Sequence, residues 1–187
     1  MKLKTITRYI LLILLFLIFF FITYESIANK ENGENRFIPL GEVDSLKMTI
    51  KFGVGKLDLI SGQECVFEGN FQYDKSILKP NVQYEILGET GVLTLSQSIK
   101  KDLDLPFPYK NRWNLKLPSD VPLQLYINTA TYIGYIDLTN LQIEYFHLNS
   151  GASQTNIEFN QPNLIDLKNI NIKTGASSIK MLGLANA

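Results

Sequence analysis

The sequence HLNSGASQTNIEF at residues 147–159 is followed by a near-copy, IKTGASSIKM, at residues 172–181. Both stretches contain Gly-Ala-Ser, at positions 151–153 and 175–177. Apolar residues alternate with polar ones on both sides of each Gly-Ala-Ser. A period of two is typical of half-buried β-strands. The sequence therefore predicts, twice, a pair of strands that meet at a corner made of small residues.

The repetition extends over the last third of the chain. Three segments can be aligned: LQLYINTATYIGYIDLTNLQI from Leu123, EYFHLNSGASQTNIEFNQPNLI from Glu144 and DLKNINIKTGASSIKMLGLANA from Asp166. In each segment an apolar pair precedes the corner and another pair follows it. The pairs are Leu125/Ile127 with Ile136/Leu138, Phe146/Leu148 with Ile157/Phe159, and Ile170/Ile172 with Ile179/Met181. Repeats of about 21 to 24 residues are too short to bury their own apolar face, so we expect them to stack as turns of a β-solenoid.

The recurring glycines are explained by the corner itself. We expect Gly151 and Gly175 to turn the backbone sharply with a positive φ, where a Cβ would clash. Ala152 and Ala176 would then point into the corner, and the serines at 153 and 177 would hydrogen-bond nearby backbone. A serine-lined ligand site is the alternative interpretation of the same residues.

Residues upstream of the repeats alternate in the same way. Short runs with a period of two begin at Met48, Leu57, Val82, Leu93 and Trp113. No stripe with a helical period of 3.6 residues is sustained beyond residue 30, so the fold class is all-β, with helix expected only near the N-terminus. The sequence GVG at 53–55 lacks the third glycine and the following helix of a phosphate-binding loop. The charged, proline-containing segment 96–111 is expected to be a solvated loop that joins an N-terminal sheet to the stacked repeats.

The N-terminus carries an export signal or a membrane anchor. Residues 9–24, YILLILLFLIFFFITY, contain no charge, and Lys2, Lys4 and Arg8 precede them. The basic flank predicts a cytoplasmic N-terminus and an exported C-terminal domain. Ser26-Ile27-Ala28 provides small residues for signal cleavage before Asn29, so an uncleaved single-pass helix in the cell membrane and a secreted, cleaved form both remain open. We therefore expect an anchor or signal at 1–28, a polar linker at 29–40 and an all-β domain at 41–187.

Two further stretches of the sequence are distinctive. They are FEGNFQY at 67–73 with Lys79-Pro80 after it, and NRWNLKLP at 111–118 around Trp113. Together with the two Gly-Ala-Ser corners, they resemble the bacterial toast-rack family, and the resemblance covers most of residues 48–187. It implies an adhesin-like β-repeat domain, similar to the C-terminal domains of membrane proteins that respond to cell-wall-active antibiotics, with no established enzymatic activity. Such domains usually continue through further Gly-Ala-Ser turns, so the resemblance also implies a truncated chain or a partner that covers the last strand edge.

Composition excludes several functional classes. The 18 basic residues equal the 18 acidic ones, and the basic excess near the N-terminus leaves the remainder mildly acidic, which argues against nucleic-acid binding. The only cysteine, Cys65, cannot form an intrachain disulfide and is expected to be a buried apolar residue, with a reactive thiol as the alternative. The only histidine, His147, lies between two apolar strand residues and is expected to face outward.

No catalytic residue, cofactor site or metal site is predicted. A single histidine and a single cysteine give neither zinc-ligand spacing nor a nucleophile–base pair. Asp102 and Asp104 could serve a glycosidase or a calcium site, but such closely spaced acids in a loop are usually only solvated. Aromatic residues are concentrated between Phe107 and Tyr145. If Tyr132 and Tyr135 were exposed together, they would form a patch for glycans or proteins, whereas cross-strand packing is the commoner use.

The expected function is that of a non-catalytic, adhesin-like interaction module of the bacterial cell envelope. Its partners would be the membrane, through the N-terminal helix, and an unidentified envelope protein or wall polymer. The first alternative is a regulatory membrane protein for envelope stress that acts through a membrane partner. The second is an enzyme that acts on wall glycans, which would need acids such as Asp102 and Asp104.

Overall fold

The computed structural model describes residues 33–39, 41–62, 65–74, 78–99 and 110–187. In these residues the chain forms ten strands of one mixed sheet and a short 3-10 helix. The elements are β1 (Gly33–Pro39), β2 (Ser45–Gly62), β3 (Cys65–Tyr73), β4 (Leu78–Leu87), β5 (Thr90–Ile99), β6 (Asn111–Pro118), β7 (Pro122–Asp137), β8 (Gln142–Glu158), β9 (Asn169–Thr174), β10 (Ser177–Leu182) and η1 (Leu184–Asn186). The all-β prediction is confirmed for this part of the chain. The helix expected at 1–28 lies outside the described residues.

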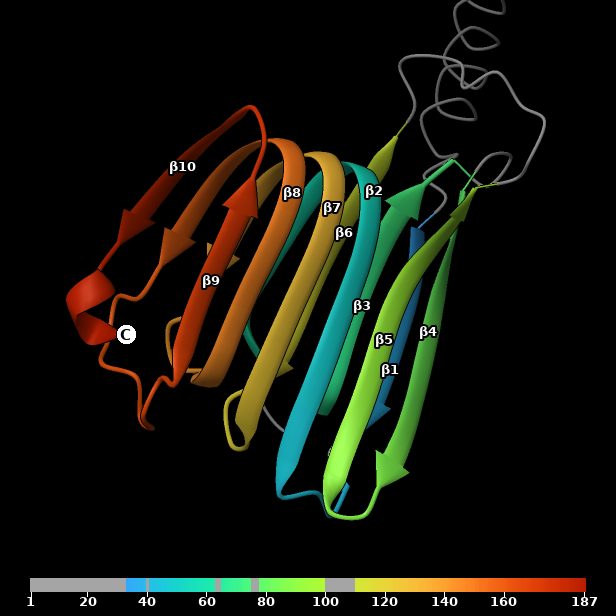
Figure 1. Ribbon diagram of the computed structural model, residues 1–187. Coiled ribbons are helices and arrows are strands. Elements are labelled where there is room, and N and C mark those ends of the chain that lie inside the picture. Colours follow the sequence, from blue (N-terminus) through green and yellow to red (C-terminus); the bar gives the residue numbers. More distant parts are fainter. Residues whose placement is uncertain (1–32, 40, 63–64, 75–77, 100–109) are drawn as a thin grey trace, which may run out of the picture. The chain divides into compact units, whose positions relative to one another are not determined.

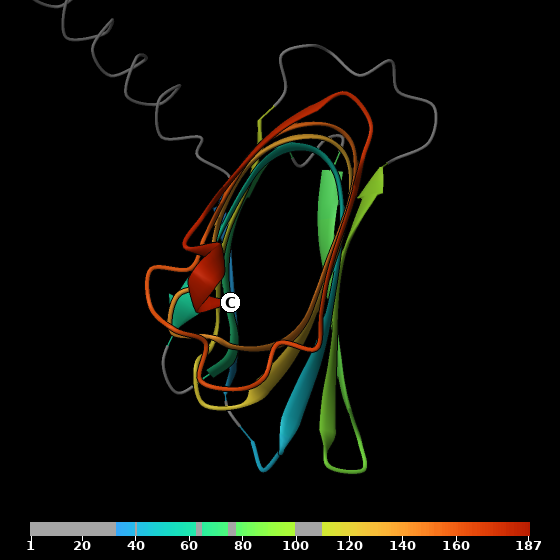
Figure 2. The same cartoon turned by 60° about the vertical axis from the view of Figure 1, so that its left-hand side comes forward.

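Three long strands bend around a common corner and stack on one another. In β2, β7 and β8 the chain runs up one side, turns and runs down the other, as Figure 1 shows. The three strands are parallel and in register, with Met48 beside Leu125 and Leu125 beside Phe146. We call each such bent layer a rung. Viewed nearly along the stack, the rungs superimpose as an elongated ring (Figure 2). The buried apolar side chains of the core fill the space between its two sides.

Two further rungs are split into separate strands. β5 pairs with β2 before the corner and β6 pairs with β2 after it, so both lie on the same side of β2. β9 and β10 pair with β8 in the same two-part manner at the other end of the stack. The expected division into an N-terminal sheet and a separate stack of repeats is therefore wrong, because β2 lies between β6 and β7. Residues 96–99, expected in a loop, extend β5, and residues 100–109 lie outside the described residues.

The rungs form two walls. The first wall contains β4, β5, the parts of β2, β7 and β8 that precede the corner, and β9. The second wall contains β1, β3, β6, the parts of β2, β7 and β8 that follow the corner, and β10. Residues 33–39, expected in the polar linker, form β1, which pairs antiparallel with β3. No helix among the described residues is both long and apolar enough to cross a membrane.

Alternating apolar residues from both walls fill the space between them. The largest fully buried side chain is that of Trp113, whose ring meets those of Phe52 and Phe71 edge-on with centroids 5.0 Å apart in each case. Phe52 belongs to the first wall, and the other two belong to the second. This contact therefore joins the walls across the interior, and edge-to-face aromatic pairs add to the stabilisation from apolar burial.

The glycines of the Gly-Ala-Ser corners are required for a different reason from the one expected. Neither Gly151 nor Gly175 has a positive φ, so that prediction is wrong. A Cβ on Gly151 would lie 2.6 Å from the carbonyl oxygen of Ala130, and one on Gly175 would lie 2.5 Å from that of Gly151. Rungs stacked at strand spacing bring the backbone of the preceding corner too close for any side chain.

Candidate binding face

The outer surface of the first wall is built from alternate residues of its strands. In β7, Leu125 and Ile127 are buried in the core, so Tyr126 and Asn128 point outward. In-register parallel pairing places His147 of β8 beside Tyr126 and Asn149 beside Asn128. The rigid stack therefore fixes the relative positions of side chains that are far apart in the sequence.

Two columns of outward side chains cross four strands of this wall. In the first column Lys51 lies beside Asn128, Asn128 beside Asn149, and Asn149 beside Lys173. In the second column Thr49, Tyr126, His147 and Asn171 follow one another in the same order of strands. We call these eight residues the polar face: Thr49, Lys51, Tyr126, Asn128, His147, Asn149, Asn171 and Lys173.

Aromatic rings occupy the middle of the polar face. The rings of Tyr126 and His147 have centroids 4.9 Å apart and planes inclined by only 11°. Tyr145 adds a third ring, 6.4 Å from that of His147. The ammonium group of Lys47 lies 5.5 Å from the centroid of Tyr126, within cation–π range. His147 is on the outer side of its strand, as predicted, and the neighbouring rings leave it half-buried.

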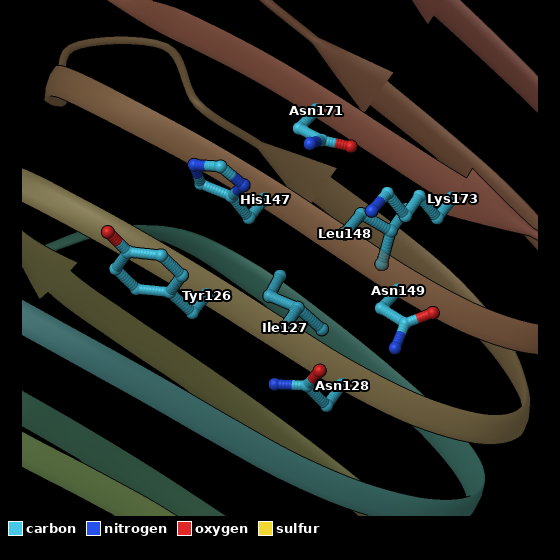
Figure 3. Close-up of a pocket in the computed structure, with 8 residues that line it drawn as sticks. All are labelled: Tyr126, Ile127, Asn128, His147, Leu148, Asn149, Asn171 and Lys173. Carbon is cyan, nitrogen blue, oxygen red and sulfur yellow. The ribbon is translucent and has the colours of Figure 1, made fainter.

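A shallow pocket of about 230 Å³ opens on the polar face between the two columns. Figure 3 shows the rings of Tyr126 and His147 on one side of it and the amides of Asn128 and Asn149 on the other. Lys173 extends from β9 over β8 in the same view. The pocket thus brings ring surface, amide groups and an ammonium group within reach of one ligand.

A separate ionic cluster adjoins the polar face. The carboxylate of Glu144 accepts a hydrogen bond from the ammonium group of Lys168 and another, at 2.9 Å, from the amide of Gln124. The bond from Lys168, with that from Gln124, lowers the pKa of the Glu144 carboxyl below its usual value. The same bond to Glu144 raises the pKa of Lys168. Glu144 therefore remains ionised and already paired at neutral pH.

Amides and ammonium groups of the polar face are not satisfied in this way. Within the part of the chain that the structure describes, the side chains of Asn128, Asn149 and Asn171 make no hydrogen bond. Lys51 and Lys173 form no salt bridge with any described residue. Asn128, Asn149 and both lysines are exposed. These groups can therefore meet a ligand without first giving up a partner in the protein.

One part of the second wall, formed by β1, β3, β6 and the end of β2, pairs its outward polar groups with one another. Asn35, Asn70 and Asn114 form a ladder, with amide-to-oxygen distances of 2.6 Å and 3.5 Å between neighbours. The guanidinium group of Arg112 lies 3.0 Å from the carboxylate of Asp58, and Lys116 lies 3.0 Å from Glu68. Similar residue types are therefore paired with one another in this part of the second wall, whereas on the polar face they have no partner among the described residues.

The aromatic pair suggested by the sequence does not form an exposed patch. Tyr132 is 3% exposed and lies in the core, and its burial raises the pKa of its hydroxyl. Tyr135 points to the outside of the second wall, where its hydroxyl lies 3.2 Å from the carboxylate of Glu158. Side chains along a strand alternate between its two faces, so residues that are three positions apart, such as Tyr132 and Tyr135, face opposite sides. A shared glycan patch on Tyr132 and Tyr135 is therefore excluded.

The corner serines bind one another instead of backbone. The hydroxyl of Ser153 lies 3.0 Å from that of Ser177 and 3.1 Å from that of Ser150. The contact between Ser153 and Ser177 joins the last two rungs, which favours the structural interpretation of the corners over a serine-lined site. Ala152 is half-buried and Ala176 is exposed, so only the former points toward the protein as expected.

The remaining candidates from the sequence are structural or lie outside the described residues. Cys65 is buried, and burial raises the pKa of its thiol, which makes the thiolate less available. Asp102, Asp104 and Phe107 fall in the segment 100–109, outside the described residues. Among the residues that are described, no cluster of His, Cys, Asp and Glu side chains could hold a metal ion.

Sequence reasoning did not identify the polar face, although a signal was present. Tyr126, His147 and Asn171 each lie four residues before the corner position of their repeat, at Ala130, Gly151 and Gly175. Aligning the repeats on the corner would have placed the three side chains in one column. The contribution of Thr49 and Lys51 could not be found in this way, because β2 precedes the repeats in sequence and joins them only in the folded sheet.

Comparison with known proteins places the fold. No curated protein matches the chain. The crystal structure of a "putative cell adhesion protein" from Clostridium sporogenes superimposes with a TM-score of 0.63 at 20% identity, covering 82% of this chain and 99% of that one. A "putative adhesin" from Parabacteroides merdae gives a TM-score of 0.24 at 11% identity, with 82% of each chain covered. Residues 27–182 match the family described as the N-terminal domain of toast_rack, DUF2154, and the chain belongs to that family.

Proposed function

We propose that this protein is a non-catalytic interaction module of the bacterial cell envelope that binds an envelope component through its polar face. The one observation that carries the proposal is the set of amides and lysines that have no partner among the described residues and are arranged around stacked rings on one wall of the sheet. Amides and lysines that have no partner among the described residues contribute little to the stability of the fold. Recognition of a ligand is therefore the simpler explanation of their arrangement.

The fold is suited to binding over an extended surface. Rungs in parallel register repeat the same outward positions at strand spacing, so a solenoid-like rack presents a row of equivalent contacts. The Clostridium sporogenes neighbour is described as a putative cell adhesion protein, and we extend that idea to this chain as part of the proposal.

We place the domain outside the cytoplasm, tethered by a single-pass N-terminal helix in the cell membrane. The support is the uncharged run at 9–24 with basic residues before it. If the chain is cleaved after Ala28, the domain is secreted and reaches its ligand without a tether. Mass spectrometry of the N-terminus of protein recovered from cells separates the two forms, since Met1 or Lys2 is retained in one and Asn29 is first in the other.

The experiment that tests the proposal is co-sedimentation of the purified, detergent-solubilised full-length chain with isolated cell-envelope material that has been freed of membrane, so that the N-terminal helix alone cannot carry the chain down. We expect the chain to sediment with the envelope, and Tyr126→Ala to reduce the bound fraction because it removes one of the stacked rings. The matched control is Phe37→Ala, which removes a ring that is 61% exposed on the second wall and should leave binding unchanged.

Each other result contradicts the proposal. If neither the parent chain nor the control sediments, envelope binding is wrong. If Tyr126→Ala and Phe37→Ala reduce binding equally, the polar face is not the contact surface. Cross-linking in intact cells that recovers a stoichiometric membrane protein bound elsewhere on the domain would instead favour the regulatory alternative. Turnover of wall glycan would favour the enzyme.

A further inference from the structure

We infer that the ligand of the polar face is an anionic sugar polymer whose chain runs across the strands, along the direction in which the rungs stack. The shared chemistry is a sugar or polyol unit that carries a carboxylate or a phosphate. This inference rests on the proposed function and adds the chemical class and the orientation of the ligand.

Charge on the polar face is positive and uncompensated. Lys51 and Lys173 stand at the two ends of one column without a carboxylate partner among the described residues, and Lys47 lies beside Tyr126. The nearest acid of the wall in β8, Glu144, already has the ammonium group of Lys168 as its partner. Ligands with negative charge are therefore favoured, even though the whole chain has a formal net charge of zero.

The spacing of the contacts fits a chain that crosses the strands. Neighbouring strands are about 4.8 Å apart, so Lys51 and Lys173 stand about 14 Å apart across three intervals. A sugar unit in an extended polymer has a length similar to one strand interval, so successive units can meet successive strands. Between the lysines, each of the two intervening strands offers an amide, from Asn128 or Asn149, that can both donate and accept hydrogen bonds with hydroxyl groups.

Rings and amides favour a sugar over a simple charged surface. Tyr126 and His147 are only half-buried, so part of each ring can contact the apolar C–H groups of a sugar unit. Asn128, Asn149 and Asn171 supply donors and acceptors that have no protein partner in the described chain. An acidic protein surface would use the lysines but would leave these amides and rings without a matching contact, so we argue for the polymer.

The test measures binding of the full-length chain to four polymers at low salt. Polygalacturonate carries carboxylates on sugar rings, and poly(glycerol phosphate) teichoic acid carries phosphates on polyol units. Dextran is a neutral glycan, and poly-L-glutamate is an anionic polymer without sugar. We expect one of the first two to bind at least about tenfold more tightly than dextran and polyglutamate, and its identity shows which acid the site prefers.

Charge-removing variants locate the contact. The double variant Lys51→Gln with Lys173→Gln should weaken binding of the preferred polymer by about tenfold, because two exposed ion contacts are lost. The control is Lys180→Gln with Lys56→Gln, which removes the same charge from the outer side of the second wall. Circular dichroism on all variants shows that the fold is retained. Added salt should weaken the parent chain's binding and reduce the difference between the two double variants.

The outcomes separate this inference from the proposed function. Equal binding of polyglutamate would overturn the inference in favour of an acidic protein partner, and equal binding of dextran would show that charge does not matter. Envelope co-sedimentation without binding of either anionic polymer also overturns it, while the proposed function stands. Failure to sediment with the envelope and to bind any polymer removes both.

Discussion

Asparagine side chains occur in two settings on the outer surface of this sheet. On the second wall, Asn35, Asn70 and Asn114 are cross-strand neighbours in antiparallel pairs, and their amides hydrogen-bond in a ladder. On the first wall, Asn128 and Asn149 are register partners in parallel strands, and no hydrogen bond joins their side chains. The amides of the ladder therefore stabilise the sheet, whereas those of Asn128 and Asn149 have no partner among the described residues.

The corner glycines give a prediction at the same scale. Gly175→Val should lower the free energy of unfolding by about 1–3 kcal/mol, because its Cβ would lie 2.5 Å from the carbonyl oxygen of Gly151 and the last rung would have to move. Thermal denaturation followed by circular dichroism measures the change. At this chain length each kcal/mol corresponds to about 2–4 °C in melting temperature.

Gly41→Val is the matched control for this substitution. A Cβ on Gly41 meets nothing within 4 Å, and that glycine does not have a positive φ. We expect its melting temperature to remain close to that of the parent chain. If Gly175→Val were as stable as Gly41→Val, close stacking at the corner would not be the reason for the glycine.

Strands at the middle and at the end of the stack differ in how well they are covered. β2 and β7 have neighbours on both sides, and their inward residues are fully buried. β9 and β10 pair only with β8 among the described strands, and their inward residues Ile170, Ile172, Ile179 and Met181 are only half-buried. This open edge agrees with the unpaired last coil expected from the sequence. That a partner covers this edge in the cell stays a prediction.

Because β9 and β10 are less buried than β2 and β7, we expect their backbone amides to be less protected from hydrogen exchange. In hydrogen-exchange mass spectrometry of the full chain, peptides from β9 and β10 should exchange faster than those from β2 and β7, because local opening of an edge strand exposes little apolar surface. Peptides from β8 serve as the internal comparison, since β8 has neighbours on both sides. Uniform exchange along the stack would mean that the rungs open only together, or that the edge is covered in solution.

At the scale of the whole molecule, an aromatic contact joins the two walls across a shared hydrophobic core. Trp113 and Phe71 from the second wall meet Phe52 from the first wall, and all three are almost completely buried. β2 carries residues of both walls and lies between β6 and β7. A substitution that weakens this aromatic contact should therefore also disturb the rungs that pair with β2. We therefore expect the contact to govern global stability.

Trp113→Ala should lower the free energy of unfolding by about 3–5 kcal/mol, as expected when a large buried aromatic side chain is removed. Urea denaturation followed by far-UV circular dichroism is the suitable measurement, since this is the only tryptophan in the chain and its fluorescence is lost. Ile133→Ala, which truncates a side chain that is 55% exposed, is the control. A similar midpoint for both variants would contradict a central role for the tryptophan.

The sequence by itself determined the all-β class, most of the strands, the repeat and the need for small residues at the corner, but not β1 or the end of β5. Alternation and the recurrence of Gly-Ala-Ser are local patterns, and strand geometry follows from them directly. The tertiary structure alone decided the order of the strands, because β2 is inserted beside β7 by pairing over a long separation in sequence. It also decided that Tyr132 faces inward, and that the corner glycines avoid a neighbouring carbonyl instead of adopting a positive φ. The polar face depends on register between separate rungs, which no single segment specifies, because its residues meet only after the rungs have stacked.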